Sequence, residues 1–214
     1  MFILSTFSDL IQIFPEDFQK PSREAIEDNI NSKYANKVVQ NVGLCVGLHD
    51  LLESSEGLIG HGTGIVNVNV KFRLVVFRPF RGEILEGVIK ENSVQGIRIA
   101  LDFFWDIFVP GPSNLFDGCK FNTAEDAWVW YEEGNELFFD KGEVVRFRVE
   151  AEQWHDLSPQ KPIRGQEEAV AEKKVPYSII GSMQQGGLGP ILWWPNEEGE
   201  AEGDAEEGAA EEEA

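Results

Sequence analysis

The residues that could carry chemistry in this chain are few and scattered. Its three histidines are His49, His61 and His155, and its two cysteines are Cys45 and Cys119. A zinc site needs three or four such ligands brought together in a tetrahedral arrangement. Only Cys45 and His49 are close in sequence. They lie four residues apart on a predicted strand, and no further histidine or cysteine lies nearby to complete a tetrahedral site. The sequence therefore predicts no metal site, and it predicts two buried, reduced thiols.

No arrangement of residues indicates an enzyme. The chain has no G-x-S-x-G nucleophile elbow, and no set of serine, histidine and acid is selected by its spacing. The glycine-rich stretch at 57–64, G-L-I-G-H-G-T-G, invites comparison with a phosphate-binding loop. Neither G-K-[ST] nor a predicted helix follows it, so a hairpin loop is the better interpretation. We expect a non-catalytic protein without cofactors.

Charge is unevenly distributed along the 214 residues. The net charge is −20, and residues 197–214 hold ten acidic residues and no basic one. The rest of the chain has a net charge of −10, which disfavours strong nonspecific electrostatic binding to nucleic acid. The acidic tail at 196–214 is predicted to be disordered, because its charges repel and it lacks apolar surface. We find no signal peptide and no run of about 18 apolar residues, so we expect a soluble intracellular protein that does not contact membranes.

One stretch, V-K-F-R-L-V-V-F-R-P-F-R-G-E-I-L-E-G-V-I at 70–89, organises the predicted elements. Apolar and polar residues alternate from Val70 to Val76, as in a half-buried strand. Pro79 then interrupts the ladder, because proline has no N–H to donate. A second strand-like run begins at Glu83. We interpret Pro79 as the joint between two domains, at 1–79 and 80–195.

The two predicted domains differ in class. The first is α+β, with a helical turn opened by Pro15 and a helix that starts at Pro21. Its strands are expected at 2–14 (bent near Ser8), 38–52 and 65–77. In the second domain, many short strands separated by polar turns indicate a small β-barrel, with an exposed, mobile insertion at 157–174. These strands are expected at 83–89, 96–103, 107–109, 128–131, 137–139, 144–151 and 177–183.

Several stretches, taken in order, resemble one protein family. K-F-R-L-V-V-F-R-P-F-R-G-E-I-L-E-G is similar to the domain junction of the larger stalk subunit of archaeal and eukaryotic RNA polymerases. Further stretches resemble the version found in RNA polymerase III: N-K-V-V-Q-N-V-G-L-C-V-G-L, L-D-F-F-W-D-I-F-V-P, W-V-W, G-E-V-V-R-F-R-V and P-Y-S-I-I-G-S-M. On this colinear set, which covers residues 1 to about 194, the chain is identified as a member of the family of larger stalk subunits of DNA-directed RNA polymerase III, which also includes archaeal proteins.

The resemblance implies an N-terminal domain of truncated RNP-like fold, which sits against the polymerase core, followed by an OB barrel of the S1 type. It implies a nuclear, non-catalytic subunit that forms a heterodimer with the smaller, mostly helical stalk subunit. Such a pair works with initiation factors and supports transcription initiation of small structured RNAs such as tRNA and 5S rRNA. The alternative is a free-standing S1/OB-fold protein that binds single-stranded RNA.

S1-type barrels bind single strands by stacking bases on aromatic rings and by placing cations along the backbone. Around Gly96 this chain has V-Q-G-I-R-I, so Ile97 and Arg98 stand where the family pattern has rings. That departure weakens the usual stacking platform. Packing in the barrel core or at an interface is the alternative for each aromatic residue. The candidates for contact with nascent RNA are Lys90, Arg98, Phe104, Trp105, Trp128 and Trp130.

A second set of residues is expected to contact the polymerase core or the partner subunit. Lys71 and Arg73 point the same way on their predicted strand, so they form either a solvated face or a contact with an acidic surface. The closing tryptophan pair is too apolar to be left in water, so it either covers the barrel or docks on the partner. The set comprises Lys71, Arg73, Arg78, Arg81, Trp193 and Trp194.

Overall fold

The computed structural model describes residues 1–132, 134–156 and 175–194, which form two packed units. One unit comprises Met1–Glu83 with the described residues between Val149 and Ile179, and the other comprises the described residues between Ile84 and Arg148 and between Ile180 and Trp194. The predicted insertion at 157–174 and the predicted tail at 196–214 lie outside the described residues. The units are groups of packed residues rather than sequence domains, and the boundary at residue 79 stays a prediction.

The N-terminal sheet is built around strand β5 (Val66–Phe77), which lies between β1 (Phe2–Ile13) and β3 (Gly43–Ser54). Strand β2 (Lys37–Val39) follows β3 at the far edge, and the short β4 (Leu58–Ile59) pairs with the start of β5. All of these pairs are antiparallel. The alternation in β5 buries every second side chain, as the sequence pattern predicts: Val68, Val70, Phe72, Leu74 and Val76.

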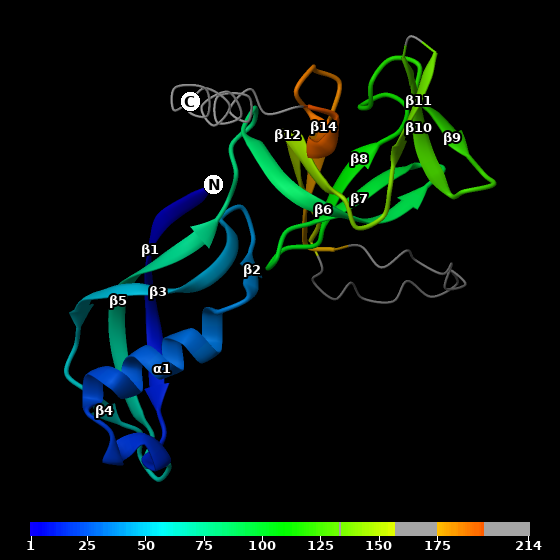
Figure 1. Ribbon diagram of the computed structural model, residues 1–214. Coiled ribbons are helices and arrows are strands. Elements are labelled where there is room, and N and C mark those ends of the chain that lie inside the picture. Colours follow the sequence, from blue (N-terminus) through cyan, green and yellow to red (C-terminus); the bar gives the residue numbers. More distant parts are fainter. Residues whose placement is uncertain (133, 157–174, 195–214) are drawn as a thin grey trace, which may run out of the picture. The chain divides into compact units, whose positions relative to one another are not determined.

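Helix α1 (Ser22–Tyr34) lies across the sheet face that carries these buried side chains (Figure 1). It follows the short 3-10 helix η1 (Pro15–Gln19), so both predicted helical segments are confirmed. Ala25, Ile26 and Ile30 of α1 are buried against the sheet. The Tyr34 ring packs on Phe72 at 5.6 Å between ring centroids. Since α1 is the only α-helix in the residues that the structure describes, the opposite face of the sheet has no α-helical cover within them.

Two details of this domain differ from the sequence prediction. The single strand expected at 38–52 is interrupted, because Asn41 (φ 61°) and Gly43 (φ 144°) have positive φ values and turn the chain between β2 and β3. At Gly43 a Cβ atom would lie 2.5 Å from Val76 Cγ1, so only glycine fits there. The register of strand β1 with β5 is unbroken, so β1 has no bulge near Ser8. The stretch at 57–64 forms a hairpin as predicted, but Leu58–Ile59 within it is strand β4 rather than loop. The loop follows β4, with Gly60 N–H donating to the Ile65 carbonyl at 2.8 Å.

The second half of the chain contains a closed barrel. Its five strands are ordered β13-β8-β7-β6-β12, and β12 also pairs with β13, which closes the ring. This arrangement confirms the predicted fold class of an α+β domain followed by an OB-type barrel. The strands are β6 (Ile84–Ser93), β7 (Gly96–Ala100), β8 (Ile107–Pro110), β12 (Val144–Trp154) and β13 (Tyr177–Ser182).

Smaller elements complete the barrel half. A three-stranded sheet is formed by β9 (Lys120–Asn122), β10 (Ala127–Glu132) and β11 (Asn135–Phe139). Strand β14 (Gly189–Pro190) pairs with β12, and the 3-10 helix η2 (Ile191–Trp193) follows it. Strands β9 and β14 were not predicted, because two or three residues carry no usable periodicity. Across the described residues, no helix combines the length and apolar character needed to cross a membrane.

Candidate functional site

The RNA-contact candidates between β6 and β8 differ in accessibility. Lys90 and Arg98 are exposed, and Arg98 Nε lies 3.8 Å from the Glu91 carboxylate. Trp105 is 72% exposed, whereas Phe104 is only 4% exposed. A base can stack only on a ring face that solvent reaches. We therefore remove Phe104, whose ring belongs to the core, from the RNA-contact set.

Trp128 and Trp130 of β10 are part of the barrel-side core. They are 3% and 9% exposed. Trp128 Nε1 donates to the Ser93 carbonyl at 2.9 Å, and Trp130 Nε1 donates to the Asp117 carbonyl at 3.1 Å. Buried indoles with satisfied N–H groups are packing residues rather than displayed platforms. Trp128 and Trp130 are therefore core-packing residues, which was the alternative to RNA contact.

The tryptophan pair near the end of the described chain is covered by other rings of the same unit. Trp193 packs on Phe116, Trp130 and Phe139, with centroid separations of 6.2, 5.6 and 4.7 Å. Trp194 Nε1 donates to the Leu188 carbonyl at 2.7 Å. Of the two expected arrangements, the structure shows the tryptophans covering their own barrel unit. Contact of their remaining exposed edges with a partner subunit stays a prediction.

The stretch of chain that carries the remaining RNA candidates is acidic overall. Residues 84–148 contain twelve acidic and six basic side chains. Burial raises the pKa of Asp106, the neighbour of Trp105, and the positive charge of Arg98 partly opposes that rise. Lys90, Arg98 and Trp105 can supply two cations and one stacking ring. Such a set fits a weak, sequence-tolerant contact with single-stranded RNA rather than a strong electrostatic grip.

Lys71 and Arg73 of β5 lie on the sheet face opposite to α1, as predicted, and each has an acidic neighbour on β3. Arg73 forms a two-point contact with Asp50, with Nε–Oδ1 at 2.7 Å and Nη2–Oδ2 at 2.5 Å. Lys71 Nζ lies 3.8 Å from Glu53. These cross-strand pairs account for both cations as a polar sheet face. Docking of this face on the polymerase core stays a prediction.

The Arg73–Asp50 pair predicts an acid-dependent loss of stability. Hydrogen bonds from Arg73 lower the pKa of Asp50 from 3.8 to about 2. A carboxyl with a depressed folded-state pKa stabilises the fold above its unfolded-state pKa, and this contribution is lost as the pH falls from about 4 to about 2. We expect Asp50→Asn to flatten the decline of stability across this window, measured by urea unfolding at several pH values. Equal slopes for Asp50→Asn and the wild-type protein would contradict the assignment.

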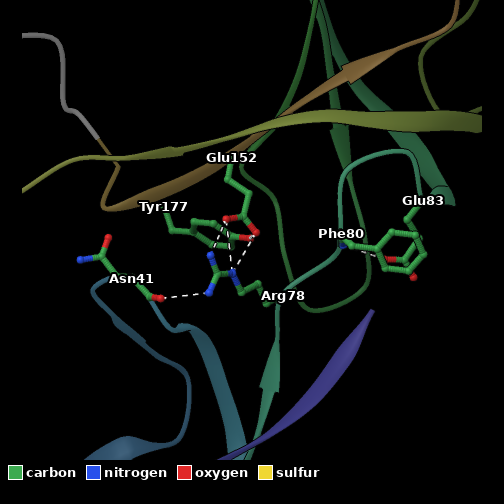
Figure 2. Close-up of polar contacts among 6 residues, drawn as sticks. All are labelled: Asn41, Arg78, Phe80, Glu83, Glu152 and Tyr177. Carbon is green, nitrogen blue, oxygen red and sulfur yellow. Dashed lines mark hydrogen bonds and ion pairs between the residues drawn. The ribbon is translucent and has the colours of Figure 1, made fainter.

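Arg78, the residue that precedes the interrupting proline, is held within the chain (Figure 2). Its Nε and Nη2 atoms each lie 3.1 Å from the Glu152 carboxylate, and Nη1 donates to the Asn41 carbonyl at 3.0 Å. Tyr177 donates its hydroxyl to the same carboxylate at 3.3 Å. The Trp154 ring stacks on Tyr177 at 4.2 Å, and its centroid is 5.9 Å from the Arg78 guanidinium carbon.

Arg78, Glu152 and Tyr177 each affect the pKa of a neighbour in this cluster. The hydrogen bond to Glu152 raises the pKa of Arg78, so the guanidinium stays charged. Burial raises the pKa of Tyr177, and the Glu152 carboxylate adds to that rise. Arg78 thus joins the end of β5 to the β2–β3 turn and to the outer ends of β12 and β13. Its predicted docking on another subunit stays a prediction, but most of its hydrogen-bonding capacity is already used inside the chain.

Sequence reasoning missed the partners of Arg78. Glu152 lies 74 residues away, and no spacing rule connects the two positions. The available signal was the alternation R-F-R-V-E-A-E at 146–152, which places a row of charges on one face of β12. Arg81, the remaining cation of the predicted set, is 82% exposed at its side chain and 3.8 Å from Glu150. It is the most accessible cation of the set.

Side chains that could ligate a metal are dispersed in the part of the chain that the structure describes. Across the described ranges, no group of three or more His, Cys, Asp or Glu side chains could hold a metal ion. Cys45 and Cys119 are free and buried, which confirms the prediction of two buried thiols. Burial raises the pKa of Cys119 to about 12, so its thiol is protonated and unreactive at neutral pH.

Comparison with known families gives the class of protein. Residues 8–64 match the SHS2 domain found in the N terminus of Rpb7p and Rpc25p, and residues 83–194 match RNA polymerase III subunit Rpc25. An SHS2 domain followed by an OB-type barrel defines an RNA polymerase subunit of the Rpb7 type, the stalk-subunit class. The chain belongs to the Rpc25/RPC8 family of RNA polymerase III subunits, as the resemblance indicated.

Individual relatives agree with that assignment. The chain is 46% identical over 205 residues to RNA polymerase III subunit rpc8 of Schizosaccharomyces pombe, covering 91% of this chain and 100% of the relative. It is 40% identical over 212 residues to RPC8 of Saccharomyces cerevisiae, with 91% and 100% covered. It is also 25% identical over 149 residues to the archaeal subunit Rpo7 of Saccharolobus solfataricus, with 70% and 81% covered.

Proposed function

We propose that this chain is the larger, non-catalytic stalk subunit of RNA polymerase III. It forms a heterodimer with the smaller helical stalk subunit, acts in the nucleus, and supports transcription initiation of small structured RNAs such as tRNA and 5S rRNA. The observation that carries the proposal is the match of both halves of the chain, over 91% of its length, to subunits named RPC8.

The proposal predicts where the chain is found and what its loss does. A tagged chain should co-purify with the polymerase core and one small helical subunit, at equal stoichiometry by mass measurement. Polymerase III depleted of the pair should lose promoter-dependent transcription with initiation factors, yet keep RNA synthesis from an artificial primer–template. Restoration of promoter-dependent transcription by the added heterodimer would support the proposal. A tagged chain recovered free of polymerase subunits would contradict it.

Contact with nascent RNA is the finer part of the proposal, and Trp105 tests it. Trp105→Ala is expected to weaken binding of a single-stranded RNA to the purified heterodimer about tenfold, because one stacked base contributes about 1–2 kcal/mol. Its 72% exposure predicts an unchanged unfolding midpoint. Leu192→Ala, at an 84% exposed apolar residue of the same unit, is the matched control and should bind like wild type. Equal affinities for all three proteins would remove Trp105 from the RNA contact.

The alternative, a free-standing single-strand RNA-binding protein, is favoured by the same exposed indole and by the exposed cations Lys90 and Arg98. It predicts micromolar or tighter binding by the isolated chain, falling steeply with salt. The acidic surroundings oppose that outcome. Tight binding by a chain that does not co-purify with polymerase would favour the alternative over the stalk-subunit proposal.

A further inference from the structure

Strand β1 forms one edge of the N-terminal sheet. Among the described residues it pairs only with β5, in unbroken register from Phe2 opposite Phe77 to Ile13 opposite Val66. The opposite edge of the sheet is β2, which is three residues long and carries Lys37. The two edges therefore differ: one is short and charged, and the other is twelve residues long.

The register shows which backbone groups of β1 face outward. Arg78 N–H donates to the Met1 carbonyl at 3.0 Å, and this pair continues the β1–β5 register. In an antiparallel ladder, hydrogen-bonded pairs alternate with pairs that point away. The odd-numbered residues of β1 therefore bond to β5, and the even-numbered residues from Leu4 to Gln12 direct their N–H and C=O groups to the outer edge. The Leu10 N–H agrees with this alternation, because it donates to the Asp9 carboxylate at 2.8 Å rather than to β5.

This edge lacks the features that normally protect one. Edge strands are usually short, or carry lysine, proline or a bulge that blocks pairing with another chain. Strand β1, F-I-L-S-T-F-S-D-L-I-Q-I, has no lysine, proline or bulge, and its one charge is Asp9. Leu4 is 50% exposed and Leu10 is 43% exposed. A long, largely uncharged and partly apolar edge is a template for strand addition.

Space for an added strand is present beside the second half of β1. A cavity of about 500 Å³ lies along Asp9–Gln12 and is bounded on its other side by Asn29, Ser32 and Lys33 of α1. The polar side chains Asn29, Ser32 and Lys33 of α1 therefore line a cavity that the second half of β1 borders, and we call this lining the α1 floor. Asp9 is fixed at this floor by Lys33 Nζ and the Tyr34 hydroxyl, both at 2.5 Å.

We propose that the free edge of β1 accepts an extended segment of another polymerase subunit as an added strand. The segment carries small uncharged or apolar side chains on the sheet face that Leu4, Thr6, Ser8 and Leu10 share, and polar side chains on the opposite face, next to α1. Main-chain hydrogen bonds supply the affinity, and alternate side chains supply the specificity. A second copy of this chain is disfavoured, because each copy carries a net charge of −20. The inference rests on the proposed function only in naming the assembly that holds the partner.

Amide hydrogen exchange at single-residue resolution tests this edge. The isolated chain and the purified polymerase that contains it are compared over residues 2–13. In the isolated chain, the amides of Leu4, Thr6 and Ser8 should exchange fast, while those of Ser5 and Phe7 are protected by β5. In the polymerase, the first three should slow at least tenfold and the last two should stay protected. This parity distinguishes strand addition from general burial, which would slow both sets.

A matched pair of variants gives a second readout. Thr6→Pro removes one outward N–H while leaving every β1–β5 hydrogen bond in place, and it should weaken association with the polymerase at least fivefold. Thr6→Val keeps the N–H and should associate like wild type. Fast exchange of Leu4, Thr6 and Ser8 inside the polymerase would overturn this inference alone. Their protection in the isolated chain would assign the edge to this chain itself and also overturn it. Absence of the chain from the polymerase would overturn the proposed function as well.

Discussion

Gly96→Ala is expected to destabilise the barrel half of the chain by about 3 kcal/mol or more. Gly96 has φ 151° at the start of β7, in a region that side chains rarely adopt. An added Cβ would lie 2.1 Å from the Val109 carbonyl oxygen and 2.9 Å from the Gly111 nitrogen, both of them backbone atoms. Backbone cannot move aside as a flexible side chain can, so backbone strain and overpacking costs of about 1–3 kcal/mol each combine.

Tryptophan fluorescence during urea unfolding measures this effect, because five of the six tryptophans lie in residues 84–148 or 180–194. The matched control is Gly142→Ala in the same unit, where φ is 95° and nothing lies within 4 Å of the added Cβ. That variant carries backbone strain without a clash and should lose only about 1 kcal/mol. Similar losses for both variants would show that the close approach at Gly96 relaxes freely, contrary to this prediction.

Arg78→Met is expected to lower the free energy of unfolding of the N-terminal unit by about 2 kcal/mol. Methionine retains the apolar stem but leaves the Glu152 carboxylate, only 20% exposed, and the Asn41 carbonyl without their shared donor. Hydrogen bonds to charged groups contribute about 1.5–3 kcal/mol, and the 39% exposure of the Arg78 side chain places the effect at the lower part of that range. In the Arg78→Met variant, amide hydrogen exchange of residues 149–154 should accelerate by an amount that matches this loss of stability.

A double-mutant cycle with Glu152→Gln separates the pair from its surroundings. We expect the two single losses to overlap, with a coupling energy of about 1 kcal/mol. Arg81→Met is the control, since its guanidinium is 82% exposed and 3.8 Å from its nearest acid, and it should be nearly neutral. If the losses in free energy of unfolding at Arg78 and Glu152 are fully additive, the two side chains drawn in Figure 2 are close but not energetically coupled.

Local patterns carried much of the fold. The alternation from Val70 to Val76 identified β5 and its buried face, and the spacing of Ala25, Ile26 and Ile30 identified α1. The turn between β2 and β3 was missed, because Q-N-V-G contains too weak a signal inside a continuous apolar run. That turn depends on how closely Gly43 approaches Val76, and such a distance is not encoded in local periodicity.

The candidate site was less predictable than the fold. Phe104 and Trp105 are adjacent in sequence, yet one is 4% and the other 72% exposed. In a loop between two strands no period fixes which neighbour turns inward, so the choice follows from packing around the barrel. The packing of Trp193 was likewise not predictable from the sequence. Its ring lies against Phe116, Trp130 and Phe139, which come from three separate segments of the chain.

The order and class of the elements, and the family, follow from the sequence, because periodicity and colinear similarity are properties of the chain read in one direction. Which charges meet follows from the tertiary structure. Arg78 contacts Glu152 across 74 residues, and β1 is an edge because, among the described residues, only β5 pairs with it. Both outcomes depend on contacts between distant segments, whose free energies no local pattern records.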